Sequence, residues 1–152
     1  MTSVDEEAQH LIVKRLRAAF PDHDVLAEEN QDLDDHGHRA EGYRWIIDPI
    51  DGTTNFTHAQ PPFCVSIALQ HGADLVVGVV MELGRNELFA AAKGSGLWVN
   101  GQPDAVSSRE TLRESLITTG FPFREFEYVD DYLQVLRDVM QHAQGVRRPG
   151  SA

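Results

Sequence analysis

The sequence has one cysteine, Cys64, so no disulfide can form within the chain and a reducing compartment, the cytoplasm, is expected. Cys64 lies in an apolar run, and we expect a buried structural thiol rather than a reactive one. The longest apolar run, around residues 75–81, is far shorter than the roughly 20 residues that cross a bilayer. The polar, acidic residues 1–7 do not resemble a signal peptide. These features predict a cytoplasmic protein with no membrane partner.

Basic residues are also scarce. The chain has 13 Lys and Arg against 24 Asp and Glu, a net charge of −11. The basic residues form no stripe, which argues against nucleic acid as the main partner. An acidic protein that handles a phosphate needs positive charge at its site. Because few Lys or Arg lie near residues 45–56, metal cations are the expected source.

The stretch 45–56 reads W-I-I-D-P-I-D-G-T-T-N-F and is the most informative part of the chain. Residues 43–47 are mostly apolar and predict a buried strand. Pro49 has no amide hydrogen, so we expect the chain to leave the sheet there. Asp48 and Asp51 then meet at a strand end, where they repel each other unless a cation lies between them. The pattern predicts a Mg²⁺ site, and the alternative is an ordinary Asp-Pro and Asp-Gly turn.

A second pair of carboxylates, Glu28 and Glu29, follows a predicted short strand at residues 25–27. The alternative interpretation is a solvated pair of surface glutamates. Residues 30–42 are polar and predict a loop. Within it four residues faintly imitate a calcium loop, but Tyr43 occupies the position that should be Glu, so calcium is not expected. These four are Asp32, Asp34, His36 and Gly37.

The flanking sequence predicts a helix followed by a run of strands. Ser3 and Glu6 have capping-box spacing, and apolar residues then recur on one face of a helix over about 4–20. Asp5 in its first turn is a favourable placement for the helix dipole. Asn100-Gly101 is a strong hairpin signal at the end of an expected antiparallel meander. Its predicted strands are 63–69, 75–83, 87–92 and 97–99.

The last third of the chain mixes helix and strand. We predict a short helix from Ser107 to about Arg113, a strand at 115–119 and a long amphipathic helix at 129–143. Gly150-Ser151-Ala152 is typical of the beginning of another helix, whose amides could receive a polar substrate.

Together these motifs resemble the inositol monophosphatase family of magnesium-dependent phosphatases. The string at 45–56 matches the central motif of that family without a gap, and Ala27-Glu28-Glu29 resembles its G-E-E element. Thr2 to Asp5 resembles its T-x-x-D element. The resemblance implies an α+β, layered sugar-phosphatase-like fold: an α/β sandwich with a mostly antiparallel meander sheet. The family places another metal-binding aspartate, in a W-D-x-x-A-G element, further along its sequence. The expectation is therefore one partial domain over 1–152, the N-terminal and middle part only. It would lack the C-terminal α/β portion and the start of the N-terminal helices.

The same resemblance implies roles for individual residues. Glu28, Asp48 and the carbonyl of Ile50 match the ligands of a first Mg²⁺, and Asp48 with Asp51 matches those of a second. A third, weaker metal position lies near an acidic residue that matches Asp5. The expected catalytic residues are Glu28, Thr53 and Asp51, with Glu28 and Thr53 orienting the attacking water. The expected substrate contacts are Asp51, Gly52, Thr53, Gly150, Ser151 and Ala152.

The resulting expectation is Mg²⁺-dependent hydrolysis of a small phosphate monoester, an inositol monophosphate or a related sugar or polyol phosphate. A homodimer is expected for the full-length protein. One alternative is a truncated, non-catalytic fragment that keeps part of the metal site. Another is a phosphatase of the haloacid dehalogenase type. Its D-x-D-G-T motif has one residue between the aspartates, whereas two separate Asp48 from Asp51.

Overall fold

The computed structural model describes residues 2–28, 42–123 and 126–152. The chain forms two compact units, residues 1–105 with 151–152 and residues 106–150. That both belong to a single partial domain stays a prediction. No helix of the described residues has the length and apolar character needed to cross a membrane.

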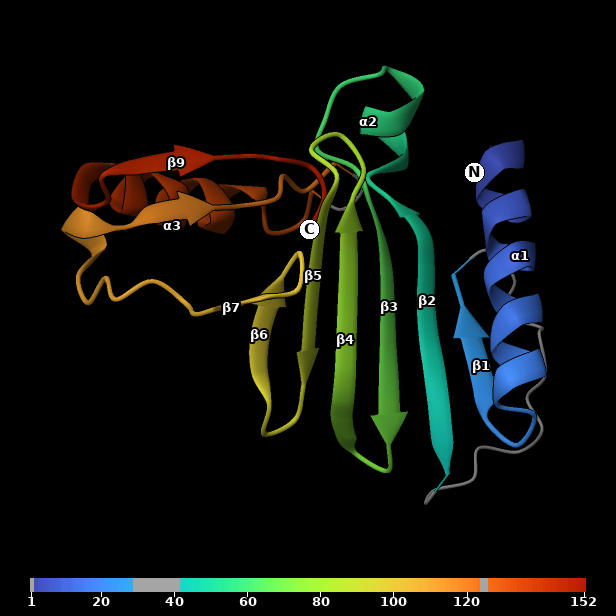
Figure 1. Cartoon of the computed structure of the whole chain (residues 1–152). Coiled ribbons are helices and arrows are strands. Elements are labelled where there is room, and N and C mark those ends of the chain that lie inside the picture. The colour runs from blue at the N-terminus through green and yellow to red at the C-terminus, as the bar shows by residue number, and fades with distance from the viewer. Residues whose placement is uncertain (1, 29–41, 124–125) are drawn as a thin grey trace. The chain divides into compact units, whose positions relative to one another are not determined.

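Helix α1 (Ser3–Ala19) opens the first unit (Figure 1). A capping box begins it, but at Thr2 and Asp5 rather than at Ser3 and Glu6 as the spacing predicted. The Thr2 side chain accepts from the Asp5 amide at 3.4 Å, and the Asp5 carboxylate accepts from the Thr2 backbone at 2.5 Å. The box is one residue earlier because Thr2 is the last residue with extended backbone before the helix.

The first unit is built on a seven-stranded sheet in the order β1 to β7. β1 and β2 are parallel and every later neighbouring pair is antiparallel, so the meander predicted for β3 to β6 is confirmed. The strands are β1 (Asp24–Ala27), β2 (Tyr43–Asp51), β3 (Cys64–His71), β4 (Asp74–Glu82), β5 (Glu87–Ala92), β6 (Gly96–Val99) and β7 (Gln102–Asp104).

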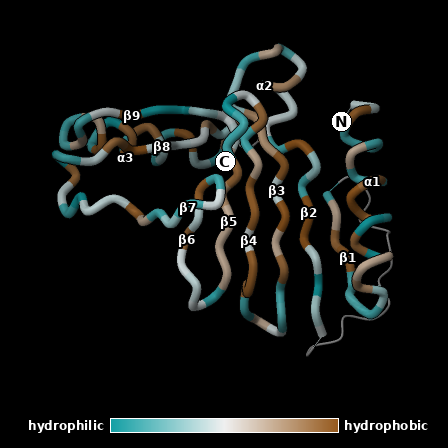
Figure 2. The backbone as a smooth tube through the Cα atoms, in the orientation of Figure 1, coloured by the Kyte–Doolittle hydropathy of each residue, from teal (hydrophilic) through white to brown (hydrophobic). Residues whose placement is uncertain are grey.

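Helix α1 packs against β2, and the core lies between them. Val13 of the helix meets Val25, Ala27 and Ile47 of the first two strands, all at most 7% exposed. Removing such side chains from water supplies roughly 1.5–3 kcal/mol each. Figure 2 shows hydrophobic residues along much of β2 to β4 and hydrophilic residues at the turns that join them. The predicted helix and strands of this unit are confirmed to within two residues, except at the end of β2.

The prediction that the chain leaves the sheet at Pro49 is wrong. β2 continues to Asp51, and its pairing with β3 shifts between Asp48 and Asp51. Asp48 pairs with Ser66 and Asp51 with Cys64. The two paired residues are three positions apart on β2 but only two positions apart on β3. This is a one-residue β-bulge, a place where a strand tolerates proline because the ladder is already interrupted.

Two turns complete the first unit. Gly52 has a φ of 85° and connects β2 directly to α2 (Thr53–Thr57), a short helix that the sequence did not predict. Asn100 and Gly101 both have positive φ, 49° and 77°, and join β6 to β7. Two consecutive positive φ values are the signature of the hairpin turn that Asn-Gly predicted.

In the second unit β8 (Leu116–Thr118) and β9 (Gly145–Arg147) form a parallel pair, joined through helix α3 (Val129–His142). The predicted strand and long helix are confirmed, whereas β9 was not predicted. The expected helix from Ser107 is only a 3-10 turn at Leu112–Glu114. A three-residue strand such as β9 carries too little periodicity to be recognised from sequence.

Candidate functional site

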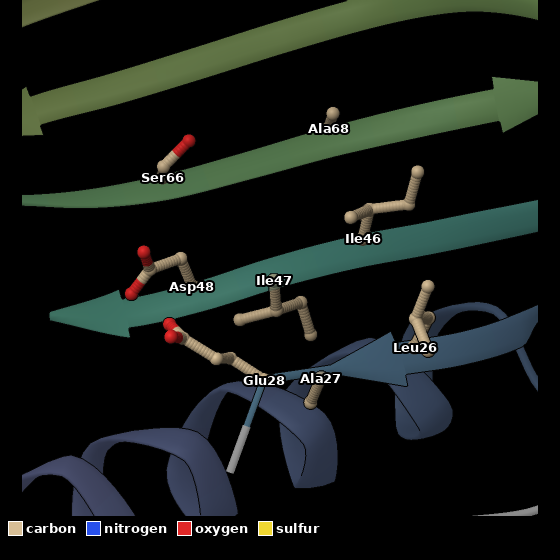
Figure 3. Close-up of a pocket in the computed structure, with 8 residues that line it drawn as sticks. All are labelled: Leu26, Ala27, Glu28, Ile46, Ile47, Asp48, Ser66 and Ala68. Carbon is tan, nitrogen blue, oxygen red and sulfur yellow. The ribbon is translucent and has the colours of Figure 1, made fainter. Parts of the chain in front are cut away.

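Glu28 and Asp48 come together because two neighbouring strands are parallel. Ala27 pairs with Ile47 at the end of the β1–β2 ladder, and the Glu28 amide donates to the Ile47 carbonyl at 3.1 Å. Glu28 and Asp48 follow these two residues, so their carboxylates lie at the same end of the two parallel strands. Figure 3 shows the two carboxyl groups directed toward each other from β1 and β2.

The bulge in β2 places Asp51 on the same face of the sheet as Asp48. In a regular strand, residues three apart point to opposite faces of the sheet. Here the extra residue makes Asp48 and Asp51 the partners of Ser66 and Cys64, which are two apart on β3 and so share a face. The D-x-x-D spacing places both carboxylates on one face only because the strand is bulged.

The electrostatic consequence is visible at Asp48. Burial, the nearby charge of Glu28, a hydrogen bond with Glu28 and the charge of Asp51 raise the pKa of Asp48 from 3.8 to about 7, against the lowering effect of the Ile50 amide. That amide donates to Asp48 Oδ1 at 3.1 Å. Burial, together with the negative charges of Glu28 and Asp51, therefore favours the protonated form of Asp48 up to about pH 7. A hard divalent cation, which prefers carboxylate oxygens, would relieve the repulsion between Glu28 and Asp48, so this facing pair fits the expected Mg²⁺.

A cavity of about 370 Å³ opens beside the two facing carboxylates. Ser66 lies on the same wall as Asp48, in the adjacent strand (Figure 3). Sequence reasoning did not select Ser66; only the β2–β3 register places this ordinary strand serine next to Asp48. The lining residues are Leu26, Ala27, Glu28, Ile46, Ile47, Asp48, Ser66 and Ala68.

Asp51 is held from a segment a hundred residues away. Its Oδ2 accepts from the Ser151 hydroxyl at 2.7 Å and from the Ala152 amide. The Cys64 thiol lies 3.5 Å from the same oxygen. Cys64 is fully buried, and its pKa is raised, chiefly by that burial. The expectation of a buried structural thiol is confirmed, although its contact with Asp51 was not anticipated.

Thr53 lies where the central motif predicted, directly after the turn at Gly52. Its hydroxyl donates to the Ile50 carbonyl at 3.1 Å, which leaves the oxygen lone pairs of Thr53 able to accept from water. A carbonyl has two lone pairs, so Ile50 retains one for another partner.

The remaining predicted site residues are placed differently. Asp5 is fully buried; its Oδ2 serves the capping box, and Oδ1 has no hydrogen-bond partner within the described part of the chain. Gly150 has a φ of 86°, and that a helix begins at residues 150–152 stays a prediction. Glu29 and the residues of the calcium-like loop (Asp32, Asp34, His36 and Gly37) lie outside the described residues.

Among residues 2–28, 42–123 and 126–152, no group of three or more His, Cys, Asp or Glu side chains is arranged closely enough to hold a metal ion. The facing pair and Asp51 are thus a partial ligand set, with Asp51 drawn toward Ser151 and Ala152.

The fold and the site together define an α+β protein with a mostly antiparallel sheet and a cluster of carboxylates at one strand end. The sequence model of the inositol monophosphatase family matches residues 1–152. The chain belongs to the inositol monophosphatase family. This match leaves no support for the haloacid dehalogenase alternative.

Individual relatives agree with the family match. The chain is 42% identical over 154 residues to a Pseudomonas aeruginosa protein named Nus factor SuhB, covering 100% of this chain and 56% of that protein. Among solved structures it is similar to the extragenic suppressor protein suhB of Bartonella henselae, with a TM-score of 0.91, 38% identity and coverage of 100% and 58%. It is also similar to inositol monophosphatase from Anabaena, with a TM-score of 0.90, 38% identity and coverage of 99% and 59%. The chain thus spans little more than half the length of these relatives.

Proposed function

We propose that this chain contributes the metal-binding strand ends of a Mg²⁺-dependent phosphatase that hydrolyses a small phosphate monoester. The proposal rests mainly on the facing carboxylates of Glu28 and Asp48, which the parallel β1–β2 pair brings together, and on Asp51, which the β2 bulge places on the same face of the sheet as Asp48. The family assignment supports the reaction class, since the fold is that of a phosphatase family.

The residues that would hold Mg²⁺ are Glu28, Asp48, Asp51 and the carbonyl of Ile50, with Asp5 beside a third position. Bound there, Mg²⁺ would lower the pKa of water and neutralise phosphate charge. The buried Oδ1 of Asp5, which has no hydrogen-bond partner among the described residues, favours keeping Asp5 in this set, because a buried carboxylate oxygen without a partner is costly.

The residues of the chain itself have separable tasks in this proposal. Glu28 accepts a proton from water, and Thr53 orients that water because its own proton is committed to the Ile50 carbonyl. Asp51, Gly52 and Thr53 line the phosphate position. A chain with a net charge of −11 would repel a phosphate dianion in the absence of cations.

The proposed substrate class is an inositol monophosphate or a related sugar or polyol phosphate. We propose that the protein acts in the cytoplasm, as its single cysteine suggests, and as a homodimer when full length.

Cation binding can be tested on this chain with Mn²⁺, whose unpaired electrons broaden nearby NMR signals. We expect selective broadening of amides around residues 28, 48 and 51, and its loss in Asp48→Asn. Asp74→Asn is the matched control, because Asp74 is an exposed aspartate paired with Lys93 at 2.8 Å. Equal broadening in all three proteins would contradict the proposed metal site.

A non-catalytic protein that keeps part of the metal site is the second candidate. The observation that favours it is the lack of a three-residue ligand cluster among the described residues. A role like that implied by the name of the Pseudomonas relative, Nus factor SuhB, would be one form of it. Mn²⁺ binding without any metal-dependent binding of inorganic phosphate would favour this candidate, because the metal site of a phosphatase must also hold phosphate.

A further inference from the structure

The contacts of Ser151 and Ala152 suggest a role other than the substrate contact that the family resemblance implies. The Ser151 hydroxyl and the Ala152 amide are both directed at one carboxylate, that of Asp51. The Ser151 hydroxyl lies 2.7 Å from Asp51 Oδ2 and 3.1 Å from the Asp51 main-chain carbonyl. The Ala152 amide donates to the same Oδ2.

The two oxygens of Asp51 are therefore not equivalent. A carboxylate oxygen has about two lone-pair sites, and Oδ2 meets the Ser151 hydroxyl, the Ala152 amide and the weakly donating Cys64 thiol. The described residues provide no hydrogen bond to Oδ1. Oδ2 is thus occupied by protein donors, whereas Oδ1 keeps its lone pairs.

We propose that Ser151 and the Ala152 amide are positioning groups that fix the Asp51 side chain so that Oδ1, and not Oδ2, serves as its metal-ligating oxygen. This inference rests on the proposed function, because Asp51 is one of the metal ligands that the proposed function names. Groups that orient a ligating carboxylate in this way commonly change metal affinity by 10- to 100-fold when removed.

Cys64, the first residue of β3, also lies close to Ser151 and to the Asp51 carboxylate. Its sulfur lies 3.4 Å from the Ser151 hydroxyl and 3.5 Å from Asp51 Oδ2. Cys64 is fully buried and pairs with Asp51 across the bulge, so its thiol lies on one side of the carboxylate. The side chain of Asp51 is therefore enclosed by β3 and by residues 151–152 of the same unit.

The contact itself can be tested without metal, through hydrogen exchange of the Ala152 amide followed by NMR. We expect this amide to exchange at least about 10-fold more slowly than in an unstructured peptide, because it is committed to Asp51. Asp51→Ala should abolish the protection, while Ser107→Ala, which changes a serine in an exposed loop, should leave it intact. Peptide-like exchange in the unmodified chain would overturn the proposal.

The functional consequence is tested by Mn²⁺ titration of the same proteins. We expect Ser151→Ala to raise the Mn²⁺ concentration for half-maximal broadening by about 10-fold, with Ser151→Thr within twofold of the unmodified chain because the hydroxyl is retained. Unchanged Mn²⁺ affinity in Ser151→Ala, with weaker binding of inorganic phosphate instead, would identify Ser151 as a substrate contact and overturn its positioning role. If the unmodified chain binds no Mn²⁺, the proposed function fails and the metal role fails with it. The exchange data on Ala152 would still decide whether the contact exists.

Discussion

At the scale of single residues, the raised pKa of Asp48 determines how the metal-free chain responds to pH. The folded state holds this proton up to about pH 7, whereas the ordinary value is 3.8. The folded state therefore binds more protons between these values, and the stability associated with the group is lost as pH rises through about 7. We expect the midpoint of urea unfolding to fall between pH 5 and pH 8 by more in the unmodified chain than in Asp48→Asn.

Cation binding should have the opposite pH dependence. Because a cation must displace the Asp48 proton, Mn²⁺ affinity should weaken by roughly 10-fold for each pH unit below 7. Calorimetric titrations at pH 5, 6 and 8 would measure this. A pH-independent affinity would show that Asp48 is not a ligand.

Cys64 should be chemically inert in the folded chain. It is fully buried, and burial raises its pKa, so little reactive thiolate forms at neutral pH. We expect labelling by a disulfide reagent at pH 7.5 to be at least about 100-fold slower than in urea-unfolded chain. Fast labelling under native conditions would contradict the described burial.

At the scale of elements, the capping box of α1 gives Thr2 a role in stability that its neighbour Ser3 lacks. Thr2 accepts from the Asp5 amide, and its backbone donates to the Asp5 carboxylate. Thr2→Ala should lower the free energy of unfolding by about 1 kcal/mol, whereas Ser3→Ala should change it by less than about 0.5 kcal/mol because Ser3 is exposed. Urea denaturation of the two variants measures the difference. Equal effects of the two substitutions would contradict the assignment of Thr2 as the N-cap.

The bulge in β2 is the feature of the sheet on which the prediction from sequence was wrong. Because proline cannot donate to a ladder, the sequence predicts that the strand ends at Pro49. It is instead accommodated within the irregular pairing between Asp48 and Asp51. The motif was identified correctly from sequence. The reason that its two aspartates share a face was not, since that depends on the partner strand.

At the scale of the whole molecule, the carboxylate set of the described residues is incomplete. Two facing carboxylates and Asp51 do not form a group of three arranged to hold a metal, and the sequence contains no W-D-x-x-A-G element. We expect the 152-residue chain to bind Mn²⁺ but to release little phosphate from myo-inositol 1-phosphate. A colorimetric phosphate assay over a Mg²⁺ series measures this. Robust Mg²⁺-dependent release would contradict the prediction.

The sequence by itself determined α1, most strands of the meander, α3 and the residues of the central motif. These are local features, in which apolar period, turn residues and motif letters lie within a few positions of one another. Tertiary structure alone decided the parallel β1–β2 pair that turns Glu28 toward Asp48, the register that brings Ser66 beside Asp48, and the contact of Ser151 with Asp51. The physical reason is that each depends on strand pairing or hydrogen bonds between residues that are 18 to 100 positions apart, which no local pattern encodes.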